Sequence, residues 1–161
     1  MANLKLTNDT SITMSMLMTP AYGNFSGYVH GGEILKMFDQ VAYVCARKYA
    51  KSYVVTLSAE NVFFFEKISI GSLLTFYASI NYTGSSSMEV GIRVQCEDID
   101  KNTQIHTNSC YFTMVSMDEN GKAKKLKPFV PKSDIEKKRY KDAQKRREVR
   151  NKKYKSFKQS K

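Results

Sequence analysis

The chain has 161 residues, of which 42% are apolar and 12% aromatic, so it can bury the core of one domain and is not disordered throughout. Its formal net charge is +11, from 26 lysines and arginines against 15 aspartates and glutamates. Taken as a whole, this charge would favour a partner such as nucleic acid or an anionic membrane.

The positive charge is concentrated at the C-terminus. Residues 122–161 contain 18 lysines and arginines and four acidic residues, a net charge of +14, whereas residues 1–121 have a net charge of −3. The basic character therefore belongs to a C-terminal tail. Two interpretations explain this basic tail equally well: a solvated extension, or a segment that contacts nucleic acid or a membrane.

The cysteines and the N-terminus indicate a cytoplasmic protein. Cys45, Cys96 and Cys110 are far apart in the sequence, and two of them lie in segments expected to be buried, which is typical of small core residues in a reducing compartment. The first ten residues lack the apolar segment of a signal peptide, and no apolar run approaches the ~20 residues needed to cross a bilayer. With two histidines and no clustered ligands, no metal site is expected.

Hydrophobic periodicity predicts one long helix among strands. Alternating apolar residues predict a strand over 11–18, and a loop with proline and glycine follows. Residues 31–50 carry apolar side chains over more than one helical stripe, which predicts a mostly buried helix. Period-two patterns predict four more strands, beginning near residues 53, 70, 88 and 103, with Glu89 and Arg93 facing outward. This order predicts an α+β fold with an antiparallel sheet packed on one helix.

The tail is expected to stand apart from a domain formed by residues 1–121. Ser133 and Glu136 form the pattern of a helix capping box, but the following residues are nearly without apolar side chains. Such a helix has no face to bury, so residues 122–161 are predicted to be partly helical or disordered, and solvated. Truncation after Gly121 is expected to leave the activity of the domain intact.

Residues 24–39 carry the candidate chemistry. Gly31 and Gly32 open the predicted helix, where backbone N–H groups can hold a carbonyl oxygen or an anion, although a tight loop-to-helix junction explains them equally well. Asp39 lies about two turns into an apolar helix, where a carboxylate is costly unless it is paired with Lys36, exposed, or used as a base or nucleophile. Asn24 either braces its loop or orients water or substrate, and a histidine such as His30 more often packs a loop than acts as a base.

The same segment reads Asn-x-x-Gly-x-Val-His-Gly-Gly-x-Ile-Leu-Lys-Met followed by an acidic residue. It resembles the signature of hotdog-fold acyl-CoA thioesterases, in the subgroup of the bacterial YciA-like enzymes and the cytosolic brain-type acyl-CoA hydrolases. The likeness extends over roughly residues 10–120. It implies a hotdog fold, a sheet of about five antiparallel strands wrapped around one long buried helix.

The resemblance also implies an activity and its residues. The activity is hydrolysis of acyl-CoA to a free carboxylic acid and CoA, with no cofactor other than the CoA thioester that is the substrate. Asp39 corresponds to the catalytic acid, as general base or as nucleophile. Asn24 corresponds to a residue that positions water or substrate from the other subunit, and the amides of Gly31 and Gly32 face the thioester carbonyl.

Contacts to CoA and self-assembly follow from the same likeness. The predicted CoA contacts are His30, Ser85, Ser86, Ser87 and Arg93. For Arg93, an outward-facing solvated position explains the residue as well as a CoA phosphate contact does. A single copy of the motif must pair with a second chain, and the family pattern predicts a homodimer that assembles into a homohexamer.

Two other functions are weighed against hydrolysis. A hotdog dehydratase acting on hydroxyacyl thioesters needs a paired histidine and acid, and the positions of His30 and His106 fit this poorly. A non-catalytic acyl-CoA-binding module, whose basic tail contacts nucleic acid or membrane, would have no need of both Asn24 and Asp39.

Overall fold

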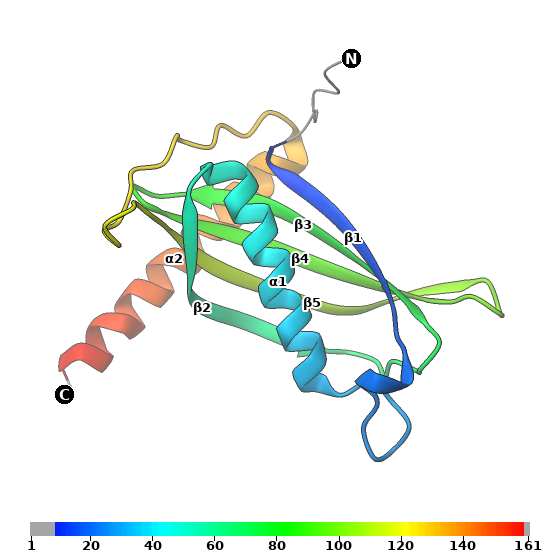
Figure 1. Cartoon of the computed structure of the whole chain (residues 1–161). Helices are drawn as coiled ribbons and strands as arrows, with labels where there is room; N and C mark the ends of the chain where they lie inside the picture. The colour runs from blue at the N-terminus through cyan, green and yellow to red at the C-terminus, as the bar shows by residue number, and fades with distance from the viewer. Residues whose placement is uncertain (1–8, 160–161) are drawn as a thin grey trace.

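A computed structural model describes residues 9–159 of the chain. Five strands form one antiparallel sheet in the order β1-β3-β4-β5-β2, and a long helix crosses one of its faces (Figure 1). The strands are β1 (Ser11–Leu17), β2 (Tyr53–Phe64), β3 (Leu73–Thr83), β4 (Ser87–Asp98) and β5 (Thr103–Met117), and the helices are α1 (Gly31–Ala50) and α2 (Asp134–Gln159). This is the α+β hotdog arrangement that the sequence predicts.

The core lies between α1 and the sheet. Alternate residues of β3 and β4 face α1, and they include Leu74, Phe76, Val90 and Val94, each almost fully buried. The ring of Phe38 on α1 packs edge-on against Phe76, with ring centroids 6.0 Å apart. The period-two pattern of these strands is therefore confirmed.

One side of α1 is open to solvent, contrary to the prediction of a mostly buried helix. Leu35 is 41% exposed and Val44 is 42% exposed in the single chain. β2 is an edge strand beside this side of α1, and it also exposes large apolar side chains, among them Tyr53, Leu57 and Phe63. An edge strand with exposed apolar residues is a surface that another chain can cover.

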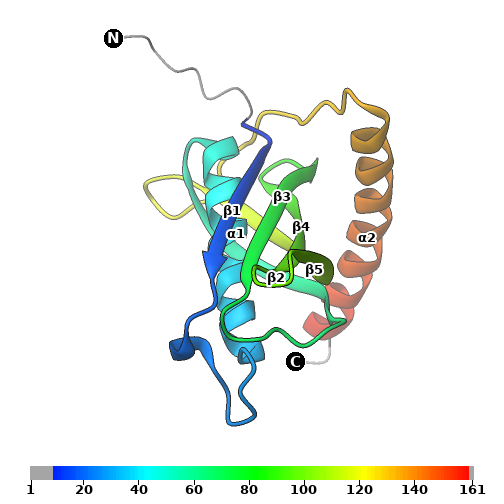
Figure 2. The ribbon, with the colours of Figure 1, turned by 90° about the vertical axis from the view of Figure 1, so that its right-hand side faces the viewer.

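The prediction of a solvated tail is wrong, because α2 packs on the sheet face opposite α1 (Figure 2). Ala143 on α2 is fully buried, and Tyr140 on the same helix packs on the core. In the connecting segment, Leu126 and Phe129 are buried as well. The segment from Leu126 to Arg150 therefore packs on the sheet, whereas residues 151–156 of α2 are exposed.

A buried ion pair fastens α2 to β4. Glu89 faces away from α1, as predicted, but it is only 3% exposed because α2 covers it. Its carboxylate accepts hydrogen bonds from Arg146 at 2.7 and 3.1 Å and from the Asn81 side chain at 3.1 Å. Burial lowers the pKa of Arg146, but the hydrogen bond and charge of Glu89, with smaller effects of Tyr111 and Asp142, outweigh it and leave that pKa raised.

The cysteines are core residues, as expected. Cys45, Cys96 and Cys110 are free and buried. Burial raises the pKa of Cys45 and of Cys110 to about 12, so neither thiol ionises near neutral pH. Within residues 9–159, no helix combines the length and the apolar character needed to cross a membrane.

Candidate active site

Asp39 and Thr56 form a hydrogen-bonded pair beside the open side of α1. Asp39 lies on α1, and its Oδ1 accepts a hydrogen bond of 2.6 Å from the Thr56 hydroxyl on β2. Lys36 does not neutralise Asp39 but contacts Glu33 at 3.7 Å. In the single chain the Asp39 carboxylate is exposed, so it is held in place yet open to a reactant.

Sequence reasoning missed the role of Thr56. The register of the sheet pairs Thr56 with Met114, a buried core residue, so the Thr56 side chain shares the face that α1 covers. The available sequence signal for a contact with α1 was a threonine at a helix-facing position of the strand next to that helix. A register shift follows directly, between Thr56 and Ser58, and marks this point of β2 as irregular.

The start of α1 offers one open backbone amide rather than two. His30 is the N-cap residue, and its Nδ1 accepts a hydrogen bond of 3.0 Å from the Gly32 N–H. In the described part of the chain, the Gly31 N–H has no hydrogen-bond partner. The expectation that both glycine amides are free is therefore corrected to Gly31 alone, and Nδ1 of His30 serves the helix cap.

Asn24 braces its own loop in the single chain. Its side-chain oxygen accepts hydrogen bonds from the backbone N–H groups of Ser26 at 2.8 Å and Tyr28 at 3.2 Å. No hydrogen bond between Asn24 and Asp39 is found within residues 9–159. The neighbouring Phe25 is fully exposed, so this loop presents an apolar side chain to its surroundings.

The serine turn lies at the other end of α1. Ser85 and Ser86 join β3 to β4, and the Ser86 carbonyl accepts a hydrogen bond from Ser116, which pairs with the start of β2. Gly31 instead approaches Phe64 at the end of β2. The serine turn is therefore remote from the glycines at the start of α1. Asp39 lies midway along the helix, and no hydrogen bond joins it to residues 85–87 within residues 9–159.

A basic side chain that sequence reasoning missed lies next to this turn. The Arg147 guanidinium on α2 lies close to Gly84 and donates a hydrogen bond of 3.1 Å to the Tyr82 hydroxyl.

Arg93 lies on the wrong side of the sheet for the predicted CoA contact in its own chain. It stands on β4 between Ile92 and Val94, which both face α1, so its side chain points to the opposite face. Asp39 and Arg93 are thus separated by the sheet.

No cluster of metal ligands accompanies the site. Across residues 9–159, no group of three or more histidine, cysteine, aspartate or glutamate side chains is placed to hold a metal ion.

Comparison with known proteins places the chain in a family. Residues 26–102 match the thioesterase superfamily. The Helicobacter pylori protein VdlD is 49% identical over 145 residues, which span 90% of this chain and 83% of that protein.

Solved structures agree with this match. The Staphylococcus aureus acyl-CoA hydrolase, in complex with butyryl-CoA, CoA and CoA disulfide, is 30% identical with a TM-score of 0.87, covering 94% of this chain and 93% of that one. A hexameric acyl-CoA thioesterase is 33% identical with a TM-score of 0.86, covering 89% and 92%.

Further structures of the Staphylococcus aureus enzyme carry alanine in place of one aspartate, one asparagine and one threonine. With a shared fold over nearly the whole of both chains and identities of 30% and above, the likeness covers more than a motif. The chain belongs to the hotdog-fold acyl-CoA thioesterases of the thioesterase superfamily.

Proposed function

We propose that this protein hydrolyses acyl-CoA thioesters to a free carboxylic acid and CoA, with Asp39 as the catalytic carboxylate. The observation that carries the proposal is the Asp39–Thr56 pair, held at 2.6 Å beside an apolar surface on the open side of α1. Asn24, Asp39 and Thr56 are separated by the same numbers of residues as the three positions replaced by alanine in the Staphylococcus aureus enzyme.

The carboxylate has two routes to hydrolysis. As a general base, Asp39 takes a proton from water, the resulting hydroxide attacks the thioester carbon, and CoA leaves as the thiol once it has been protonated. As a nucleophile, Asp39 attacks the same carbon and expels CoA, and water then hydrolyses the mixed anhydride. In both routes Thr56 holds one carboxylate oxygen, so the other is the reactive one.

Negative charge develops on the carbonyl oxygen in either route. The Gly31 N–H is proposed as its hydrogen-bond donor, assisted by the positive end of the α1 dipole. His30 supports this donor indirectly, because its bond to the Gly32 N–H fixes the first turn of α1.

The complete site is proposed to need two chains. Exposed Phe25 would anchor the Asn24 loop on a partner, and the open side of α1 with edge strand β2 would form the dimer contact. Asn24 would then reach the partner's site, where it positions water or substrate. Three such dimers would give a homohexamer, as in the hexameric relative.

The serine turn is proposed to contact CoA in the site of a neighbouring subunit. Residues 85–87 make no hydrogen bond to Asp39 within residues 9–159, and the nearby Arg147 supplies positive charge for a CoA phosphate. The proposal includes no resident cofactor, so dialysis against a chelator should leave turnover unchanged. Buried free thiols support a cytoplasmic location.

The test follows the release of CoA thiol from butyryl-CoA by the full-length protein. The Asp39→Asn variant keeps the side-chain shape but loses the base, and kcat is expected to fall by about a thousandfold. Glu33→Gln, which changes another carboxylate on α1, is the matched control and should retain turnover. Absence of release by the wild type, or unchanged release by Asp39→Asn, would contradict the proposal.

A further inference from the structure

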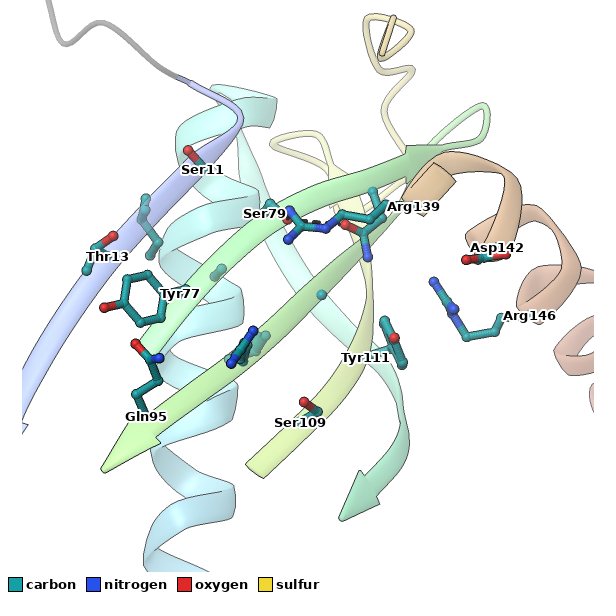
Figure 3. A pocket seen from close by; sticks show the side chains of 16 residues that line it. Ser11, Thr13, Tyr77, Ser79, Gln95, Ser109, Tyr111, Arg139, Asp142 and Arg146 are labelled. Carbon is teal, nitrogen blue, oxygen red and sulfur yellow. Dashed lines mark hydrogen bonds between the residues drawn. The ribbon is translucent and has the colours of Figure 1, made fainter. Parts of the chain in front are cut away.

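Two features that the proposed reaction does not use meet in one groove. Arg93 on the outer sheet face and the basic helix α2 both line a groove of about 700 Å³ (Figure 3). Its floor is formed by β1, β3, β4 and β5, and α2 forms one wall. The groove lies across the sheet from Asp39, and its volume is typical of a small-molecule site.

The three arginines of the groove differ in how many of their N–H groups are already hydrogen-bonded to other residues. Arg146 already has structural partners, because it forms an ion pair with Glu89 and its Cζ lies 3.7 Å from the centroid of the Tyr111 ring. Arg139 makes only a long hydrogen bond, 3.4 Å to the Ser79 hydroxyl. Arg93 has no hydrogen bond or ion pair with any residue in the range 9–159, and it is exposed. Two guanidinium groups therefore face the groove with most of their donors unused.

The charge of the lining favours an anion. Glu89 neutralises Arg146, and Asp142 is the one acidic residue that lines the groove. Figure 3 shows Asp142 on the α2 side next to Arg146, whereas the Arg139 side chain extends across β3 toward Ser79. Arg93 and Arg139 thus leave an excess of positive charge over the floor of the groove.

The rest of the floor consists of neutral hydrogen-bonding groups. Tyr77, Gln95 and Ser109 present hydroxyl and amide groups near Arg93. Paired guanidinium groups with neutral donors are the arrangement that binds phosphate oxygens. The groove is larger than one phosphate ion, so it has room for a phosphate chain or for an organic group attached to it.

We propose that this groove is a second ligand site, which binds a small polyanion carrying phosphate groups. It is separate from the reaction at Asp39. Its test measures binding rather than turnover, so the result stands whether or not the chain hydrolyses acyl-CoA.

The test titrates tripolyphosphate into the full-length protein by isothermal calorimetry. The expected result is saturable binding of one ligand per chain, weakened about tenfold by Arg93→Gln and by Arg139→Gln through loss of a charge-assisted contact. Lys141→Gln is the matched control, since it removes one positive charge from an exposed position of α2 outside the groove. This control should bind as the wild type does.

A parallel titration with ADP separates a bare phosphate chain from a phosphate ester. Equal affinity for both would assign recognition to the phosphates, and tighter binding of ADP would assign part of it to the organic group; either supports the site. No saturable binding at millimolar ligand would overturn the proposal. Equal weakening by all three substitutions would also overturn it, because diffuse charge on α2 would then explain the binding.

Discussion

At the scale of single residues, the bond from Thr56 decides which oxygen of Asp39 would react in the proposed mechanism. Because Oδ1 accepts the Thr56 hydroxyl at 2.6 Å, the carboxylate is fixed in one orientation and Oδ2 is left for water or the thioester. A carboxylate free to rotate would spend less time aligned with the substrate. Thr56 is therefore a positioning residue.

Replacing Thr56 with valine should lower kcat by about 10- to 100-fold with a smaller change in KM, since the lost bond acts on orientation rather than on binding. Steady-state release of CoA thiol measures both constants. Thr56→Ser keeps the hydroxyl and should recover most of the loss. If valine and serine behave alike, the hydroxyl does not position Asp39.

His30 should influence turnover through the first turn of α1. His30→Ala removes the cap on Gly32 and is expected to lower the free energy of unfolding by about 1 kcal/mol and to reduce kcat. His30→Asn offers another good capping side chain and should restore both quantities. Urea unfolding and CoA release measure them, and a loss that asparagine fails to rescue would show that the imidazole does more than cap the helix.

Residue chemistry was predictable only where the local sequence was unusual. Asp39 was a candidate because a carboxylate interrupts an apolar helix, and the glycine pair because it opens that helix. The resemblance to the hotdog thioesterases, rather than either feature alone, favoured a role in the reaction. Thr56 gave only a weak signal, a threonine at a helix-facing strand position, because threonine is common in strands and its contact with Asp39 depends on the register of β2 against β5. For Asn24, the loop-bracing alternative is observed in the single chain, and its action on a partner remains a prediction.

At the scale of elements, hydrophobic periodicity predicted the helices and strands that pack through apolar side chains. The helix expected over residues 31–50 and the strand expected to begin near residue 103 agree with α1 and with the start of β5. α2 was misjudged because it packs through Ala143 and through arginines whose charge is neutralised or stacked. A count of apolar residues does not detect a helix that packs in this way.

Loss of Glu89 should detach α2. Glu89→Gln leaves Arg146 without its buried counter-charge, so we expect a loss of about 3 kcal/mol in the free energy of unfolding. Urea denaturation followed by circular dichroism measures the change. Glu97→Gln, on the same strand and outside the ion pair, is the control. Equal stability of the two variants would show that the pair does not fasten α2.

Removal of the segment after Gly121 is now expected to destabilise the domain. The truncated chain would expose Glu89 and the outer sheet face, and it would lose the buried side chains of Leu126 and Phe129. This reverses the expectation drawn from the sequence, in which the tail could be removed without consequence.

At the scale of the whole molecule, the net charge of +11 gives little information about the reaction. The charge is concentrated in the C-terminal segment, whose helix α2 covers the sheet face away from Asp39 (Figure 2). The residues proposed to react lie instead on the uncovered side of α1, which one chain leaves open. The single copy of the motif predicts a second chain, but patterns within one chain do not show how the proposed partner would cover that side.

The most direct test of a two-chain thioesterase site is complementation between two inactive variants. Asp39→Asn and Asn24→Ala chains, co-expressed with different tags and purified as mixed oligomers, are assayed for CoA release from butyryl-CoA. In a mixed dimer one site keeps both native residues, so random pairing should restore activity to about a quarter of wild type, while each variant alone stays inactive. Mixed oligomers as inactive as the separate variants would contradict the account, because Asn24 and Asp39 would then act within one chain.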